Sequence, residues 1–489
     1  MRRGFFAAVL LLVLLFSGCS APLGGSVEEL LEAPKLSQSQ TLVVEALNRH
    51  VGGSVKLQYP RQGEFLSPFV FRDLDGDGVE EAVVFYSDAT GNASQYVRIA
   101  LLEQSDGKWN VSWDEEGLGV GVDSVQFSSM YGAQTAALIV GYLNTGVNDK
   151  FLAVYNYNEE SPGMSRVDER QYCEYTLADF TGTGTDDLIV LSSTGEPDSM
   201  LVTMLTVEEG KLRPVTSVAL DSLLESSSQI YASLSAGSYS LVIDGFTSGG
   251  TLASEQLYFD RKSGRLISCG DRLNIEIPTL STRVGTTLSS RDVDEDGAVE
   301  IPVVLGNVSA FSTEQRMQWV SFYDFAAIDE YQNNFEKETV EPGRQIPSVL
   351  PLPQSESSPQ SQSDTAQQPE QEDTPAQEEI EPTNEKVFGL ADLSYGYYMR
   401  LPVSWKNRVT VERLGSRNWY LTDTASGETL LTVQILGTDE RLISGGDRFG
   451  DVEDYVQAAT VGRYRIFVRV RQDAGIDAVQ ILSGVTVLS

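Results

Sequence analysis

The sequence predicts a mainly β protein: a β-propeller of about five or more four-stranded blades over residues 39–342, then a disordered linker and a small α+β domain. Short apolar runs alternate with turn residues from about residue 55 onward, which is typical of strands. An acidic loop that leads into an apolar run recurs along this region. A stretch rich in Pro, Gln, Ser and Glu, residues 343–386, then separates the repeats from residues 387–489.

The spacing of the acidic loops gives the length of the repeat. Their first aspartates, Asp73, Asp179 and Asp292, lie 106 and 113 residues apart, and halving these intervals gives a period of about 55 residues. The midpoints, near residues 126 and 235, keep a polar glycine loop followed by an apolar run but lack the acids. Each unit is long enough for four strands, and a ring of such sheets leaves only short protected edges. Separate sandwiches of about 100 residues are the alternative, and they would give half as many units.

Local signals refine this outline. Residues 39–52 have leucine and valine at helical spacing and are expected to form a short helix or an entry strand. The sequence EEGK at 208–211 predicts a tight hairpin turn. We expect LNIEIP, residues 273–278, to be a further strand.

The N-terminus predicts export. Arg2 and Arg3 precede an apolar run that is too short to span a bilayer and that ends in small residues, as a signal peptide does. The ending FSGC resembles the lipobox of bacterial lipoproteins. That resemblance implies removal of residues 1–18, lipid on Cys19 and a membrane-anchored protein on the extracytoplasmic face of a bacterial cell, with 19–38 as a tether. Plain secretion without the lipid is the alternative.

The first acidic loop, residues 73–81, predicts a calcium site. Calcium prefers about six to eight oxygen ligands, and a backbone bend at Gly78 would let the loop wrap one ion. Position twelve is Val84 and the flanking residues indicate a strand, so an EF-hand is excluded. The candidate ligands are the side chains of Asp73, Asp75, Asp77 and Glu81 and the carbonyl of Val79.

This loop resembles the aspartate-rich loop of FG-GAP and VCBS repeats, which occur in integrin-like β-propellers. The resemblance implies structural calcium; an acidic surface loop that binds nothing is the alternative. The third loop, residues 292–300, has the corresponding ligands Asp292, Asp294, Asp296, Glu300 and the carbonyl of Ala298. The middle loop, residues 179–187, has Asp179, Thr181, Thr183 and Asp187, and we expect it to bind weakly or not at all because hydroxyls are poorer ligands.

Composition excludes several functions. The net charge is −35, from 70 acidic and 35 basic residues, which excludes a general nucleic-acid binder. His50 is the only histidine, so Ser-His-Asp and Cys-His pairs have no support and no zinc site is expected. Cys173 and Cys269 could pair in an exported chain, although two buried free thiols are the favoured interpretation.

The C-terminal part alternates apolar and polar residues in strands near 394–401, 419–423, 429–436 and 464–471. Residues 451–459 and 477–487 are expected to be helices. The run YGYYMRLPVSWKNRVTVE is similar to a small module related to the PsbP and Mog1 sandwich. Arg465, Arg469 and Arg471 form a basic stripe, interpreted either as a solvated strand face or as a contact for an anionic ligand.

Together these features predict a cell-surface lipoprotein that binds a protein or glycan ligand without catalysing a reaction. An extracytoplasmic glycan hydrolase or lyase is one alternative, because paired carboxylates can hydrolyse glycosides. A structural component of an envelope assembly is another.

Overall fold

A computed structural model describes residues 36–88, 96–132, 136–146, 150–157, 163–194, 200–284, 288–311, 316–327, 385–415, 417–472, 474 and 478–488. The signal peptide, Cys19, residues 19–35 of the tether and residues 343–384 of the linker lie outside these residues. The chain divides into two compact units, described separately below. Unit 1 is Met1–Gln126, Val140–Thr145 and Asn156–Ser165, and unit 2 is Phe127–Ile139, Gly146–Tyr155 and Arg166–Ser489.

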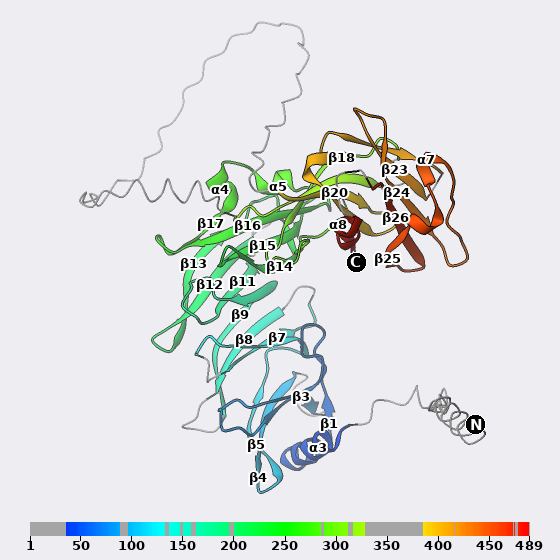
Figure 1. The fold of residues 1–489 in the computed structure, drawn as a ribbon. Coiled ribbons are helices and arrows are strands. Elements are labelled where there is room, and N and C mark those ends of the chain that lie inside the picture. Colours follow the sequence, from blue (N-terminus) through cyan, green and yellow to red (C-terminus); the bar gives the residue numbers. More distant parts are fainter. Residues whose placement is uncertain are drawn as a thin grey trace, which may run out of the picture. The chain divides into compact units, whose positions relative to one another are not determined.

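Unit 1 contains a helix and a five-stranded sheet of order β1-β3-β4-β5, with β2 also paired to β3 (Figure 1). Ser37 caps the helix because its side chain accepts a hydrogen bond from the amide of Gln40. The segment predicted as a helix or an entry strand at 39–52 is therefore a helix, Gln38–Val51. The elements are α3 (Gln38–Val51), β1 (Val55–Leu57), β2 (Phe69–Arg72), β3 (Glu81–Asp88), β4 (Arg98–Ser105) and β5 (Lys108–Glu116).

Helix α3 covers one face of this first sheet. Its buried residues Val43, Ala46 and Leu47 pack with alternate residues of β3, among them Val84 and Tyr86. In a closed ring of blades, both faces of every sheet would contact another sheet. The helix occupies one of those faces here, so the first sheet is capped as a terminal repeat of an array is.

The next four strands are β6 (Gly121–Ser128), β7 (Ala137–Leu143), β8 (Lys150–Tyr157) and β9 (Met164–Gln171), in the order β6-β7-β8-β9. Their residues are divided between the two units.

Two antiparallel four-stranded sheets follow in unit 2, and each strand pairs with the strand that follows it in the chain. The hairpin predicted at 208–211 is confirmed: Glu209 and Gly210 have φ of 51° and 72° between two paired strands. One sheet is β10 (Glu174–Ala178), β11 (Asp187–Ser193), β12 (Met200–Glu208) and β13 (Lys211–Ala219), and the other is β14 (Ser226–Ser235), β15 (Ser238–Phe246), β16 (Leu252–Asp260) and β17 (Arg265–Ser268).

Alternate residues of one strand belong to two different cores. Ile189 and Leu191 of β11 pack with residues of β15, whereas Leu188 and Val190 pack with residues of β7 and β8. Successive side chains of a strand point to opposite faces, so the β10–β13 sheet buries both faces. The mainly β class and the repeated four-stranded antiparallel sheets are therefore confirmed. Closure of these sheets into a ring stays a prediction.

The strand expected at 273–278 is wrong. This segment follows β17 and contributes to two short helices, α4 (Cys269–Leu273) and α5 (Ile277–Leu280). Ser268 caps α4 by accepting a hydrogen bond from the Gly270 amide, and Asn274 ends it in the left-handed region with φ of 56°. Local capping thus overrides the strand preference of the isoleucines.

The strands on the two sides of the linker form one sheet, which corrects the predicted division at residues 343–386. Strand β19 pairs with β20 from Met317↔Asp392 to Tyr323↔Glu385. The linker also ends two residues earlier than predicted. The sheet has the order β18 (Ile301–Asn307), β19 (Met317–Tyr323), β20 (Glu385–Asp392), β21 (Tyr397–Leu401) and β27 (Val485–Val487).

A last sheet packs against this one and completes a sandwich with an aromatic core that includes Tyr397, Trp405 and Trp419. The strands predicted near 394–401, 419–423, 429–436 and 464–471 are confirmed. The remaining elements are η2 (Val403–Trp405), β22 (Val409–Arg413), β23 (Asn418–Asp423), β24 (Thr429–Leu436), α7 (Gly446–Phe449), η3 (Val452–Asp454), β25 (Val456–Val461), β26 (Tyr464–Val470) and α8 (Ala478–Ser483).

The two helices predicted in this module need correction. Residues 451–459 form only the single turn η3 before β25, which pairs with β26 at the sheet edge. Residues 477–487 contain α8 and then β27. Among the described residues, no helix combines the length and the apolar character that a membrane span requires.

Candidate metal centres

The three acidic loops share one backbone conformation. Loop positions four and six lie in the left-handed region in each loop, and glycine fills five of these six places. In each loop the aspartate at position one accepts a hydrogen bond from the position-six amide, at 2.8–3.0 Å. The left-handed residues, with φ from 62° to 94°, are Gly76, Gly78, Gly182, Gly184, Glu295 and Gly297.

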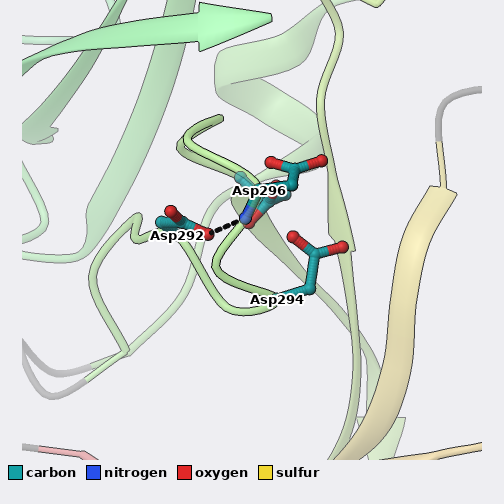
Figure 2. A group of neighbouring side chains, drawn as sticks. Asp292, Asp294 and Asp296 are labelled. Carbon is teal, nitrogen blue, oxygen red and sulfur yellow. Dashed lines mark hydrogen bonds between the residues drawn. The ribbon is translucent and has the colours of Figure 1, made fainter.

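The third loop lies in unit 2, between α5 and β18. Asp292 holds its turn because it accepts from the amide of Asp296 at 3.2 Å (Figure 2). It also accepts from the amide of Gly297 at 3.0 Å. At its base, Arg291 and Glu300 exchange two backbone hydrogen bonds of 3.1 and 3.0 Å. The Asp292 side chain therefore closes the turn, and backbone pairing closes the base of the loop.

This closure brings together the four carboxylates that the sequence predicted. Asp292, Asp294, Asp296 and Glu300 each offer an oxygen, and these oxygens all lie within 4.8 Å of one another. The fourth member differs from the three aspartates that Figure 2 labels, because its side chain is fully buried.

Buried oxygens of the third loop lack partners. One oxygen of Glu300 accepts from the Val293 amide at 3.0 Å, but its Oε1 is buried and accepts no hydrogen bond, and the same holds for Oδ1 of Asp294. Burial raises the pKa of Glu300 to about 8 and also raises the pKa of Asp294. An unpaired buried acceptor costs about 1–3 kcal/mol. A hard cation would satisfy these oxygens, so the residues present fit a calcium ion.

The first loop, in unit 1, gathers three carboxylates where the sequence predicted four. Asp73, Asp75 and Glu81 offer oxygens within 4.8 Å of one another. The fourth, Asp77, is not part of this group, and its Oδ1 accepts from the Val79 amide at 2.7 Å. Burial raises the pKa of Glu81 to about 7, and its Oε2 accepts from the Leu74 amide at 2.7 Å. This loop has the same plan as the third but a smaller set of converging ligands.

Coordination of a metal by the carbonyls at position seven, those of Val79 and Ala298, stays a prediction. The amides of Val79 and Ala298 donate to the aspartates two residues earlier, Asp77 and Asp296. These hydrogen bonds fix the backbone at position seven, and metal coordination by its carbonyl is a prediction in both loops.

The middle loop fills its interior with hydrogen bonds. Thr181 donates its amide and its hydroxyl to Asp187 Oδ2 at 2.8 and 3.0 Å, and its hydroxyl lies 3.2 Å from that of Thr183. A Cβ at Gly182 would meet the Arg261 guanidinium, so a positive charge lies directly against this loop. Among the described residues, no third acidic side chain joins Asp179 and Asp187 in a metal-ligand group.

Other residues singled out in the sequence have protein partners. His50 Nε2 lies 3.1 Å from Asp114 Oδ2, which connects α3 to β5. The basic stripe is paired as well, with Arg469 at 3.3 Å from Asp454 and Arg471 at 3.2 Å from Glu428. Arg465 lies over the ring of Phe467 and donates to the Gly437 carbonyl.

Cys173 and Cys269 are free thiols. Cys269 is buried, as the favoured interpretation of the sequence expected, whereas Cys173 is only half-buried. Burial raises the pKa of the Cys269 thiol to about 12, so this thiol is protonated at neutral pH.

Two cations lie beside the third loop that the sequence did not predict there. Lys386 Nζ lies 3.7 Å from Asp296 Oδ2, and the positive charges of Arg400 and Lys386 both act on Asp294. Both residues follow the linker and lie on β20 and β21. Only the pairing of β19 with β20 brings them to the loop, and no local pattern in the sequence indicates it.

No protein-family model and no curated protein matches the sequence. Among solved structures, the chain is similar to Sqt1 of Saccharomyces cerevisiae at 9% identity, over 87% of this chain and 84% of that one, with a TM-score of 0.28. A Bacillus licheniformis rhamnogalacturonan lyase matches at 11% identity, over 55% of this chain and 65% of that one, with a TM-score of 0.27. A Lactobacillus plantarum protein matches at 9% identity, over 77% and 93%, with a TM-score of 0.25. Structural similarities this weak give no information about the activity of this chain.

Proposed function

We propose that this chain is a calcium-stabilised, non-catalytic binding module that lipid on Cys19 holds at the extracytoplasmic face of a bacterial membrane. Its sheets would present a surface to a protein or glycan ligand. The first and third loops would each hold one calcium ion. The lipid anchor rests on the FSGC sequence alone, because Cys19 lies outside the described residues.

The buried carboxylate of Glu300 is the observation that carries the calcium proposal. It has one hydrogen bond and one unpaired oxygen, and three aspartate oxygens converge on the same place. A protein without an ion would have to bury this negative charge or keep it protonated, and both cost free energy of folding. Calcium would supply the missing positive charge and the missing partner for Oε1.

Calcium would act here on stability. Extracellular modules bind calcium at about 0.1–1 mM, and one site of about 0.1 mM affinity contributes about 1.4 kcal/mol at about 1 mM calcium. The ligands sit in loops that lead into β3, a central strand of its sheet, and into β18, the edge strand of its sheet. Bound ions would thus fix the entry to those sheets and keep the surrounding surface in one conformation.

Thermal unfolding of the full-length protein in detergent tests this proposal. The melting temperature should rise in 1 mM calcium relative to chelator, and 1 mM magnesium should have less effect because magnesium keeps its waters and prefers octahedral sites. Glu300→Gln should lose a large part of the calcium-dependent rise. Glu453→Gln, an exposed change of the same charge, should keep it.

An unchanged melting temperature in millimolar calcium, together with no calorimetric binding, would overturn the calcium part. For the anchor, Cys19→Ser should move the protein from the membrane fraction to the soluble fraction. If the wild-type protein and Cys19→Ser remain with the membrane fraction equally, the lipid assignment is wrong. Turnover of a glycan by the purified protein would replace the binding role with the enzyme alternative.

A further inference from the structure

A pocket of about 350 Å³ lies in unit 2 between β20, β21, η2 and α8. Two cations, Lys386 and Arg400, line it together with the polar side chains of Gln480 and Ser483. Val403 and Ile481 add apolar surface. The volume is at the small end of ligand pockets, which suits one sugar ring or one amino-acid residue.

The two cations of this pocket are also neighbours of the third loop. Lys386 forms an ion pair with Asp296 at 3.7 Å, and both partners are part-exposed. Arg400 is exposed and projects from the adjacent strand β21, and its charge reaches Asp294. The same two side chains thus interact with the loop carboxylates and line the pocket.

A calcium ion in the third loop would change what these cations face. Without an ion, the loop carboxylates attract Lys386 and Arg400 directly. With an ion, the two positive charges of calcium neutralise the same carboxylates and repel the neighbouring cations. Lys386 would then be released from Asp296. Lys386 and Arg400 would both be available to pair with an anionic ligand in the pocket.

We propose that this pocket binds the carboxylate of a small ligand, such as a sugar acid, and that calcium in the third loop strengthens this binding. Arg400 would receive the carboxylate with its planar guanidinium, and Lys386 would add a second charge. Gln480 and Ser483 would hydrogen-bond hydroxyl groups. This inference rests on the calcium site of the proposed function and names the ligand chemistry. By linkage, a bound carboxylate would raise the calcium affinity of the third loop by the same factor.

Titration calorimetry on the full-length protein with sodium glucuronate tests the pocket at constant ionic strength. We expect binding in the millimolar range in the presence of calcium, and affinity at least fivefold lower in chelator, which is within the usual range of coupling between sites. Neutral glucose should bind more weakly than glucuronate. Acetyl-alanine, which has a free carboxylate on a peptide-like body, distinguishes a peptide terminus from a sugar acid as the source of the anion.

Substitutions then assign the effect to residues. Arg400→Gln and Lys386→Gln should each weaken glucuronate binding about tenfold, because each removes a charge-assisted hydrogen bond. Arg441→Gln, an exposed cation elsewhere in the same sandwich, should leave it unchanged. In Glu300→Gln, glucuronate affinity should stop responding to calcium, which also controls for pairing of calcium with glucuronate in solution.

Asp296→Asn separates this inference from the calcium proposal. The variant releases Lys386 without any ion, so in chelator it should bind glucuronate more tightly than the wild-type protein does. Equal affinity of Arg400→Gln and wild type would overturn the pocket. Absence of glucuronate binding by a protein shown to be calcium-loaded would do the same. If the wild type binds no calcium, but Asp296→Asn in chelator gains affinity, the proposed function fails and the carboxylate pocket stands.

Discussion

The third loop and the middle loop of unit 2 have the same backbone and different charges. In both, the first aspartate accepts hydrogen bonds from the amides of positions five and six. The third loop then adds three more carboxylates and leaves a buried oxygen of Glu300 without a partner. The middle loop instead has threonine hydroxyls that bond to Asp187 and to each other, with Arg261 against Gly182.

This comparison separates two roles that one sequence motif combines. The aspartate at position one builds the turn, and it does so both in the loop with four carboxylates and in the loop with two. The side chains at positions three, five and nine decide whether the turn has an unsatisfied negative interior. A glycine-rich turn of this shape is therefore a fold signal, and only the additional carboxylates make it a candidate metal centre.

The largest expected difference between the loops comes from removing the first aspartate of each. Asp292→Ala and Asp179→Ala each remove the acceptor for two backbone amides, so both should destabilise the protein by about 1–3 kcal/mol in chelator. In 1 mM calcium, Asp292→Ala should cost about 1.4 kcal/mol more, because the site is lost as well. Denaturant unfolding of the full-length protein, followed in calcium and in chelator, measures the loss of the turn hydrogen bonds and the loss of the calcium site.

Asp179→Ala is the matched control for this experiment, since its cost should be the same with calcium and with chelator. An additional calcium-dependent loss in Asp179→Ala would show that the middle loop binds an ion, and the comparison would fail. Equal costs of Asp292→Ala in both conditions would show that the third loop binds none.

Conversion of the middle loop is the second test and should have a smaller effect. Thr181→Asp with Thr183→Asp restores the carboxylates, but Arg261 already supplies a positive charge next to Gly182. We expect the double variant to bind no additional calcium and the triple variant with Arg261→Gln to bind one more ion at millimolar concentration. Calorimetric stoichiometry measures this. If the double variant alone gains a site, Arg261 does not act as the substitute cation.

The acidic loops and the strands after them could be predicted because their information is local. Aspartate at alternate positions, glycine at the left-handed places and an apolar run are all contained in residues 71–86. Lys386 and Arg400 could not be predicted, because they reach the third loop only through pairing of β19 with β20 across the linker. Composition marked that linker as a boundary, yet a boundary in composition says nothing about which strands pair around it.

The wrong elements have a common cause. Residues 451–459 have a polar and apolar mixture that suits a helix, but VQAATV pairs with β26 at a sheet edge. Residues 273–278 read as a strand, but the Ser268 cap and Asn274 turn them into helical segments. In both cases tertiary pairing or capping outweighs propensities that differ by less than about 1 kcal/mol per residue.

The smallest expected effect concerns position four of the third loop, where Glu295 takes the left-handed conformation that Gly76 and Gly182 adopt in the other loops. A side chain with a Cβ is strained at φ of 62°. Glu295→Gly should relieve this strain and raise stability by about 0.5–1 kcal/mol, after the entropy that glycine adds to the unfolded chain is subtracted. Because the substitution also removes a negative charge from the loop, Glu295→Gln is the control for charge alone. Melting temperatures in chelator should rank glycine above glutamine. If the two variants are equally stable, repulsion among the acids, and not backbone strain, is what distinguishes this loop at position four.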